Sequence, residues 1–407
     1  LTVQPDEAFH FKNVWYNAAH DTKGPLGYVP LHLIGSFFQN QYSTWQMFSL
    51  NLISFFVMMI FVCHIVLLLT KNRFLAMLVT TFFGFTTAAF AMTLFLRMYI
   101  FEAMLLVIYT YIILRFMQQE KWIPSVIGVG IMVCLGGLTD YLFLSYAFFV
   151  TVSEMLYLLF QKKKKKLMAL AASSFAGVLA MIAIFPAAIA QMTDANGISR
   201  VWGTPLKFSF QFRMMFSIIT SELTGIHPDF YFNMTRYYVL WILIALLVIL
   251  FLLRFLFRKE PWLQHVRQKI KSWMKRMVVR CKSLSLQMLI FFAASIFELV
   301  LVEKRINLWE MNVFSDRYVF PVYPILAMAL VLLIYRIALW ISEDVAGKNQ
   351  KLTYGIVIAL LLFCVINSQR MTANIYLAKA ITDQTSISLV EKLRDKDVIV
   401  LCENDIV

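Results

Sequence analysis

Long apolar stretches alternate with short polar connections along most of the chain. A helix needs about 20 residues to cross a hydrocarbon core about 30 Å thick. Ten stretches reach or approach that length: residues 46–70, 74–96, 98–116, 122–138, 141–160, 167–191, 237–257, 284–302, 318–341 and 352–369. All are too long for barrel strands, and helices satisfy their own backbone hydrogen bonds in lipid. The pattern therefore predicts an all-α polytopic membrane protein with about ten transmembrane helices.

The polar segments divide the chain into three parts. Residues 1–45 form an outer loop whose apolar residues recur at rough helical spacing, which predicts short amphipathic helices in the membrane interface. Residues 46–370 form the transmembrane bundle, with an outer loop at 192–236 and a basic cytoplasmic loop at 258–283. Residues 371–407 are polar and begin an outer soluble segment that we expect to be truncated.

Composition supports this membrane assignment. The 407 residues are 60% hydrophobic, with a formal net charge of +14. In a soluble protein that charge would suggest a nucleic-acid partner, but here the lysines and arginines fall on alternate connections, as the positive-inside rule requires. The run Lys162–Lys166 and the segment 258–282 therefore mark cytoplasmic loops. A topology anchor is the favoured interpretation of these loops, and contact with anionic lipid is the alternative.

Two adjacent acids stand in the first outer loop, on the side opposite the lysines. Asp6 and Glu7 follow Pro5 in a polar context. A carboxylate at a membrane surface can accept a proton from an incoming nucleophile, or it can hold a divalent metal beside a phosphate. The alternative interpretation, which composition alone favours, is that both acids cap the helix that follows.

Further charged residues map to the same membrane side. Arg97 ends the second span and matches phosphate geometry, although it could serve as an interfacial anchor. Asp140 either lines a site or caps the fifth span. Asp316 and Arg317 open the ninth span, as phosphate ligands or as an ion pair at the helix entry. His227 is a candidate metal ligand in the long outer loop, where such residues are usually solvated.

Three acids fall inside predicted spans. Glu102 follows Arg97 and could be its counter-charge. Glu154 and Glu298 are embedded acids, which are functional hypotheses by default. No Walker A loop, GxSxG elbow or Rossmann fingerprint is found, and the five cysteines show no CxxC pair or disulfide framework.

Four short motifs follow one another along the chain: Asp6-Glu7, Pro25-Leu26 with Tyr28, Gly137-Leu138-Thr139 with Tyr141, and Arg317-Tyr318 with Pro321 and Pro324. Their order resembles that of the GT-C superfamily of polytopic glycosyltransferases. The likeness is closest to the bacterial branch similar to protein O-mannosyltransferases and the lipid A aminoarabinose transferase. Lys23-Gly24 stands where His-Pro is usual in that family, and Asp140 stands where the family often has His.

This resemblance implies transfer of a sugar from a polyprenyl-phosphate donor at the extracytoplasmic face of the cell membrane. The acceptor would be a lipid, a glycan or a protein. Asp6 would be the catalytic base, Glu7 would assist it or hold a divalent metal, and Arg97 and Arg317 would bind the donor phosphate. No cofactor is required by the sequence, although some family members use a divalent cation. The site-lining residues would be Lys23, Tyr28, Asp140, Tyr141, Asp316, Tyr318 and His227.

Three other functions are compatible with the sequence. A transporter or flippase of lipid-linked saccharide would need charges at mid-membrane depth and broken helices in repeated halves. A ligase or polymerase of polyprenyl-linked glycans would carry a large outer loop late in the chain, whereas 303–316 is short. A non-catalytic homologue is the third. Because the charges gather at the outer rim, we favour the enzyme.

Overall fold

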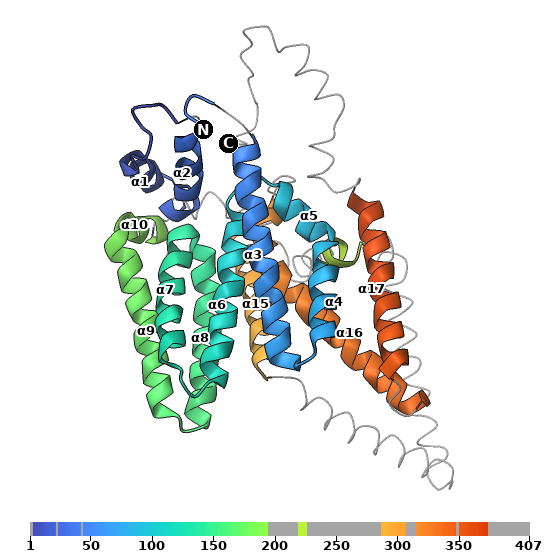
Figure 1. Ribbon diagram of the computed structural model, residues 1–407. Helices are drawn as coiled ribbons and strands as arrows, with labels where there is room; N and C mark the ends of the chain where they lie inside the picture. Colours follow the sequence, from blue (N-terminus) through green and yellow to red (C-terminus); the bar gives the residue numbers. More distant parts are fainter. Residues whose placement is uncertain are drawn as a thin grey trace, which may run out of the picture.

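The computed structural model describes seven segments of the chain: residues 3–21, 23–41, 44–193, 219–225, 286–306, 315–346 and 350–372. Within these segments every regular element is a helix (Figure 1). The first helices along the chain are α1 (Lys12–Ala19), η1 (Pro25–Gly27), α2 (Val29–Phe37), α3 (Thr44–Thr70) and α4 (Arg73–Gly84). The next are α5 (Thr87–Leu94), α6 (Tyr99–Gln118), α7 (Ile123–Thr139), α8 (Tyr141–Phe160), α9 (Lys164–Ile184) and α10 (Ala187–Thr193). The last are α15 (Leu286–Ile306), η2 (Ser315–Val322), α16 (Tyr323–Ala346) and α17 (Gln350–Thr372).

Six of these helices are long and apolar enough to cross a membrane. They are Thr44–Thr70, Tyr99–Gln118, Tyr141–Phe160, Lys164–Ile184, Tyr318–Leu339 and Gln350–Gln369, and each coincides with a predicted span. The predicted spans 122–138 and 284–302 are shorter apolar helices, and 237–257 lies outside the described residues. The described part of the chain is thus all-helical, and its six long apolar helices are those of a multi-pass membrane protein, while the count of ten spans is not confirmed.

The predicted span 74–96 is two helices rather than one. α4 and α5 meet at a bend of 58°, which makes them a broken span or a re-entrant loop. Thr86 explains the break, because its hydroxyl accepts a hydrogen bond from the backbone N–H of Ala89 at 3.3 Å and caps α5. A threonine that can cap a new helix competes with the continuation of the old one.

Short helices cover one end of the bundle, as expected for residues 1–45. We call α1, η1 and α2 the cap. Figure 1 shows the cap above α7 and α9, next to α10. η1 packs on α7, and α2 packs on α3. A Cβ on Gly24 would collide with the backbone carbonyl of Leu138, so only glycine allows the cap to approach α7 this closely.

The connections rich in lysine and arginine gather at the other end. The α3–α4, α6–α7 and α8–α9 connections all lie at the lower end in Figure 1, away from the cap. They contain Lys71, Lys121 and the run beginning at Lys162. We call this the lysine end and the opposite one the cap end. The alternating topology predicted from charge is therefore reproduced by these connections.

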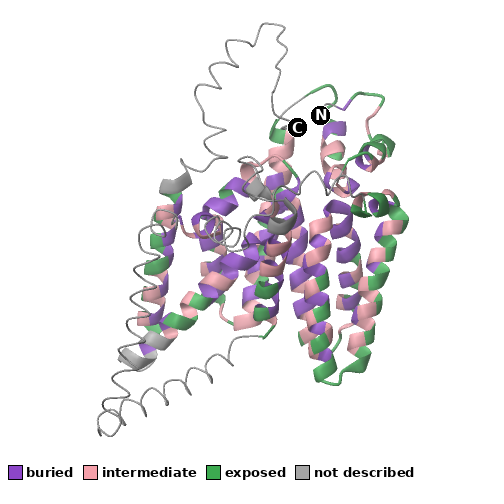
Figure 2. Cartoon of the chain, turned by 180° about the vertical axis from the view of Figure 1, so that it is seen from behind, coloured by how far each residue is buried: buried purple, intermediate pink, exposed green. Residues whose placement is uncertain are grey.

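Burial separates the interior of the bundle from its periphery. Buried residues face the helices' shared interior, while exposed ones lie on outward faces (Figure 2). The outward faces carry large apolar side chains such as Ile53, Phe56, Phe148 and Phe175, each more than half exposed. Such a surface suits lipid rather than water.

Candidate functional site

A buried ion pair joins the cap to the bundle. Lys23 lies between α1 and η1, and its Nζ donates to Oδ2 of Asp140 between α7 and α8. The two side chains are only 15% and 4% exposed. Asp140 Oδ1 accepts from the backbone N–H of Leu142 at 3.0 Å and caps α8. The predicted helix cap is confirmed, and the same carboxylate also neutralises a lysine.

Two tyrosine rings enclose the Lys23 ammonium. Nζ lies 5.3 Å from the ring centroid of Tyr99 and 5.2 Å from that of Tyr318. Burial on its own would lower the pKa of Lys23, but the Asp140 carboxylate more than reverses this, so the pKa stays above its usual range. Lys23 is therefore a permanently charged group held by one carboxylate and two aromatic faces.

Two more carboxylates lie beside this pair inside the bundle. Glu102 on α6 is 0% exposed, and Glu298 on α15 is 1% exposed. Within the described part of the chain, no hydrogen bond reaches either carboxylate. Glu102 interacts electrostatically with Lys23, Asp140 and Glu298. The suggestion that Glu102 neutralises Arg97 is wrong, because Arg97 is exposed and Lys23 is the cation that acts on Glu102.

A second polar group lies at the rim of the cap end. Tyr28 Oη donates to Asp21 Oδ2 at 2.7 Å. Burial raises the pKa of Tyr28, the bond to Asp21 and the Asp21 charge raise it further, and the Arg97 and Lys23 charges oppose them. Arg97 is exposed in the connection between α5 and α6, so its guanidinium is available to a ligand.

Gln191 of α10 links the end of α1 to the start of α8 by hydrogen bonds. Its Nε2 donates to the backbone carbonyls of Ala18 at 2.7 Å and Asp21 at 2.6 Å. Its Oε1 accepts from Tyr141 Oη. The predicted site residue Tyr141 thus positions the end of α1 through one bridging amide.

The acidic pair occupies a turn at the edge of the cap. Asp6 is exposed, and Glu7 is half-buried. Glu7 Oε1 accepts from Asn13 Nδ2 at 3.1 Å and Oε2 from the backbone N–H of Gln4 at 3.4 Å. The helix-cap interpretation is wrong, because α1 begins at Lys12 with Phe11 at its N-cap and no side-chain cap bond.

The predicted site residues therefore do not form a single cluster. Lys23, Asp140 and Tyr318 meet in the buried pair, and Tyr28 and Arg97 share the rim beside it. Asp6 and Glu7 make no contact with that pair among the described residues. His227 lies outside the described residues, as do the side chains of Asp316 and Arg317, whose backbone belongs to η2. The structure links four further residues to the site, and none of them belongs to a sequence motif: Asp21, Tyr99, Gln191 and Glu298.

The described residues contain no group of side chains that matches the divalent metal implied by the resemblance. No three His, Cys, Asp or Glu side chains of the described segments come together as metal ligands would. Asp6 and Glu7 alone offer fewer ligands than the six to eight oxygens that Ca²⁺ takes.

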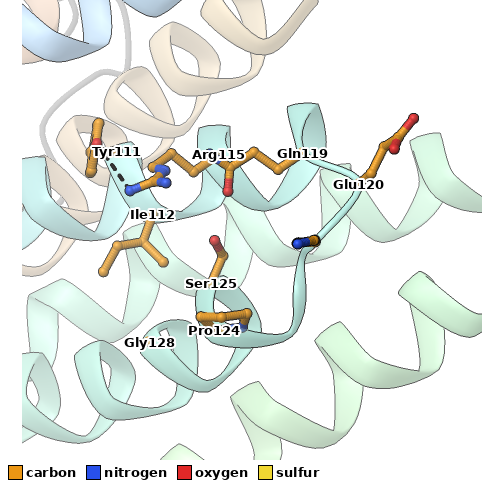
Figure 3. Close-up of a pocket in the computed structure, with 9 residues that line it drawn as sticks. Tyr111, Ile112, Arg115, Gln119, Glu120, Pro124, Ser125 and Gly128 are labelled. Carbon is orange, nitrogen blue, oxygen red and sulfur yellow. Dashed lines mark hydrogen bonds between the residues drawn. The ribbon is translucent and has the colours of Figure 1, made fainter.

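A cavity of about 580 Å³ lies between α6 and α7, far from the buried pair. Figure 3 shows the Arg115 guanidinium turned toward the Tyr111 hydroxyl, at 3.4 Å. The cavity belongs to the lysine end and so is separate from the candidate site. Its lining is Tyr111, Ile112, Arg115, Gln119, Glu120, Lys121, Pro124, Ser125 and Gly128.

Comparison with known proteins identifies no relative of this chain. No family model matches the chain, no curated protein matches it, and no solved structure matches its fold.

Proposed function

We propose that this chain is a glycosyltransferase that moves a sugar from a polyprenyl-phosphate donor to an acceptor at the extracytoplasmic face. The observation that carries the proposal is the buried Lys23–Asp140 pair with Tyr318. Lys23, Asp140 and Tyr318 belong to three motif-bearing segments that lie far apart in the sequence. Their contacts bring these segments together at the end of the bundle opposite the lysines. A lipid-linked donor is accessible there from the membrane, and an acceptor from the aqueous side.

Charge placement at the cap end supports phosphate binding. The exposed Arg97 guanidinium offers the planar fork of donors that suits phosphate oxygens. Lys23 is already neutralised by Asp140, so its contribution is to fix the cap on the bundle. Arg97 therefore binds the donor phosphate in this proposal, and Arg317 is its expected partner.

The reaction is a displacement at the anomeric carbon. An acceptor oxygen or nitrogen forms the new bond as the bond from carbon to the phosphate oxygen breaks, with inversion. The proton of the nucleophile passes to the exposed Asp6 carboxylate, and the lipid phosphate leaves with its charge stabilised by arginine. Asp6 suits the role of base because its carboxylate is exposed, and none of the described residues holds it by hydrogen bonds as Glu7 is held.

Kinetics of two variants test these roles. Asp6→Asn should lower kcat by about 100-fold or more, since a positioned general base contributes about that much. Arg97→Gln should raise the KM for the donor more than it lowers kcat. Glu120→Gln, at the lysine end, is the matched control and should leave both constants unchanged. Equal activity of Asp6→Asn and the wild type would remove Asp6 from the mechanism.

A transporter of lipid-linked saccharide is the second candidate, and one observation favours it. α4 and α5 form a span broken by 58°, and buried acids lie within α6, α8 and α15. Broken helices and embedded charges are typical of transporters. Donor movement between leaflets of a proteoliposome without release of lipid phosphate would select this function.

A further inference from the structure

We propose that the cavity between α6 and α7 binds the phosphate headgroup of an anionic phospholipid from the membrane leaflet at the lysine end. This inference goes beyond the proposed function and does not depend on it. The cavity holds about 580 Å³ and lies between the last turns of α6 and the first turns of α7. Its volume falls within the range of roughly 300–1,000 Å³ that is typical of ligand pockets.

Arg115 gives this cavity a positive charge that no acid among the described residues neutralises by an ion pair. Nη1 of Arg115 donates to Tyr111 Oη at 3.4 Å, and the guanidinium carbon lies 5.7 Å from the centroid of the Tyr111 ring. The Gln119 amide, with its oxygen toward the guanidinium, accepts from Nη2 at 2.8 Å and from Nε at 2.9 Å. Both partners are neutral, so they hold the guanidinium in place and leave its charge for a ligand.

Two negative features close to Arg115 do not oppose an anion there. The Glu120 carboxylate is exposed, and Figure 3 shows it pointing away from the Arg115 guanidinium. The carbonyls at the C-terminal end of α6 carry the negative end of the helix dipole. Lys166 Nζ of α9 donates to two of them, those of Phe116 at 3.0 Å and Gln119 at 2.9 Å. The end of α6 is therefore already neutralised by a cation other than Arg115.

Polar groups also line the cavity from α7 and from the connection before it. Figure 3 shows the Ser125 hydroxyl turned toward the side of the cavity on which Arg115 lies. Lys121 belongs to the same lining and is exposed. A guanidinium, a hydroxyl and an ammonium that line one cavity are the donors that suit phosphate oxygens. We therefore assign the cavity to a phosphate group.

The depth of Arg115 matches the phosphate layer of a membrane. α6 has 20 residues, which rise about 30 Å at about 1.5 Å per residue. The hydrocarbon core of a bilayer is about 30 Å thick. Arg115 lies in the last turn of α6, so its guanidinium reaches the level at which the headgroups begin. Basic pockets between helices on the cytoplasmic side are known to bind phospholipid headgroups.

Apolar surface next to the cavity favours a lipid over a soluble phosphate compound. Ile123, Ile127 and Ile131 recur every four residues along α7, and each is more than half exposed. Pro124 and Gly128, which follow two of them in the sequence, line the cavity. A phospholipid with its headgroup in the cavity can bury an acyl chain against this stripe, whereas a phosphate ion gains nothing from it.

Lipid retention, measured by native mass spectrometry, tests the proposal. The full chain in detergent is mixed with dioleoylphosphatidylglycerol or with dioleoylphosphatidylcholine, whose headgroup has no net charge. We expect the wild type to retain phosphatidylglycerol preferentially. Arg115→Gln should weaken this retention by about tenfold, the effect of losing a hydrogen bond between charged groups. Lys165→Gln is the matched control, because it removes one charge from the exposed lysine run, and it should change retention by less than about twofold.

Three outcomes would overturn the proposal. Equal losses in Arg115→Gln and Lys165→Gln would show that the lysine end attracts lipid through its overall charge. Equal retention of the two lipids by the wild type would remove the preference for an anion. Inorganic phosphate at the concentration of the lipid should not displace it, and displacement would assign the cavity to a soluble phosphate compound.

Crosslinking to the unaltered chain distinguishes a lost site from a lost fold. A phosphatidylglycerol analogue with a diazirine at its headgroup is photolysed in the presence of the wild type, and peptide mass spectrometry locates the adducts. We expect adducts between residues 111 and 128, which bound the cavity. Adducts confined to Lys162–Lys166 would place the lipid on the lysine run and contradict the proposal.

Discussion

At the scale of single residues, the Lys23–Asp140 pair is the feature on which the candidate site depends. A buried pair costs desolvation of two charges, and this is offset only when its geometry is good and other groups support it. Here Asp140 also accepts a hydrogen bond from a backbone N–H, and the Lys23 ammonium lies over two aromatic rings. Losing one partner therefore leaves the other as an uncompensated charge.

Lys23→Met should destabilise the chain by about 3–5 kcal/mol, the usual cost of removing one partner of a buried pair. Thermal unfolding in detergent, followed by circular dichroism, measures the loss. The double variant Lys23→Met with Asp140→Asn should recover part of it, because the stranded carboxylate is then neutral. A double variant less stable than both single variants would show that the two side chains do not act on each other.

The direction in which the pKa of Lys23 is shifted determines how the stabilising effect of this pair depends on pH. The pKa of Lys23 is raised in the folded chain, so its contribution to stability is complete below the unfolded lysine value of about 10.4. That contribution is lost only as the pH rises through the higher folded value. The penalty of Lys23→Met should then be constant between about pH 7 and about pH 9. A penalty that shrinks across this interval would contradict the assignment.

At the scale of elements, the cap is held against the bundle by close backbone contact as well as by charge. Gly24→Ala places a methyl group against the carbonyl of Leu138 and should cost about 1–3 kcal/mol by overpacking. Gly355→Ala in α17 is the matched control, since a Cβ there has nothing within 4 Å and alanine favours helix.

Hydrogen exchange locates the effect of Gly24→Ala. Amides of α1 and α2 should exchange faster, while those of α6 should keep wild-type protection. Uniform loss of protection throughout the bundle, or none at all, would mean that the cap does not dock through Gly24.

Most of the elements could be predicted from sequence because apolar run length is a local property. Six spans coincide with predicted ones, and short helices occur where residues 1–45 suggested them. The break at Thr86 was missed, since a single hydroxyl that caps α5 lies inside a continuous apolar run. The Lys23–Asp140 contact could not be predicted from spacing, because the partners are 117 residues apart.

At the scale of the whole molecule, the proposed function requires the cap end and the lysine end to face opposite sides of the membrane. Single cysteines at Tyr16 in the cap and Lys164 at the start of α9 test this, in a background lacking the five native cysteines. A membrane-impermeant thiol reagent applied to intact cells should label the cap cysteine alone, because lysine-rich loops stay inside. Labelling of both positions, or of Lys164→Cys alone, would contradict the proposed orientation.

Release of lipid phosphate distinguishes a glycosyltransferase from a transporter or a non-catalytic homologue. The purified chain in nanodiscs is given labelled polyprenyl-phosphate sugars and candidate acceptors, with Asp6→Asn measured beside the wild type. We expect the wild type to release free polyprenyl phosphate and to form glycosylated acceptor, and Asp6→Asn to do neither at a comparable rate. Donor binding by both proteins, with release of lipid phosphate by neither, would contradict the transferase assignment.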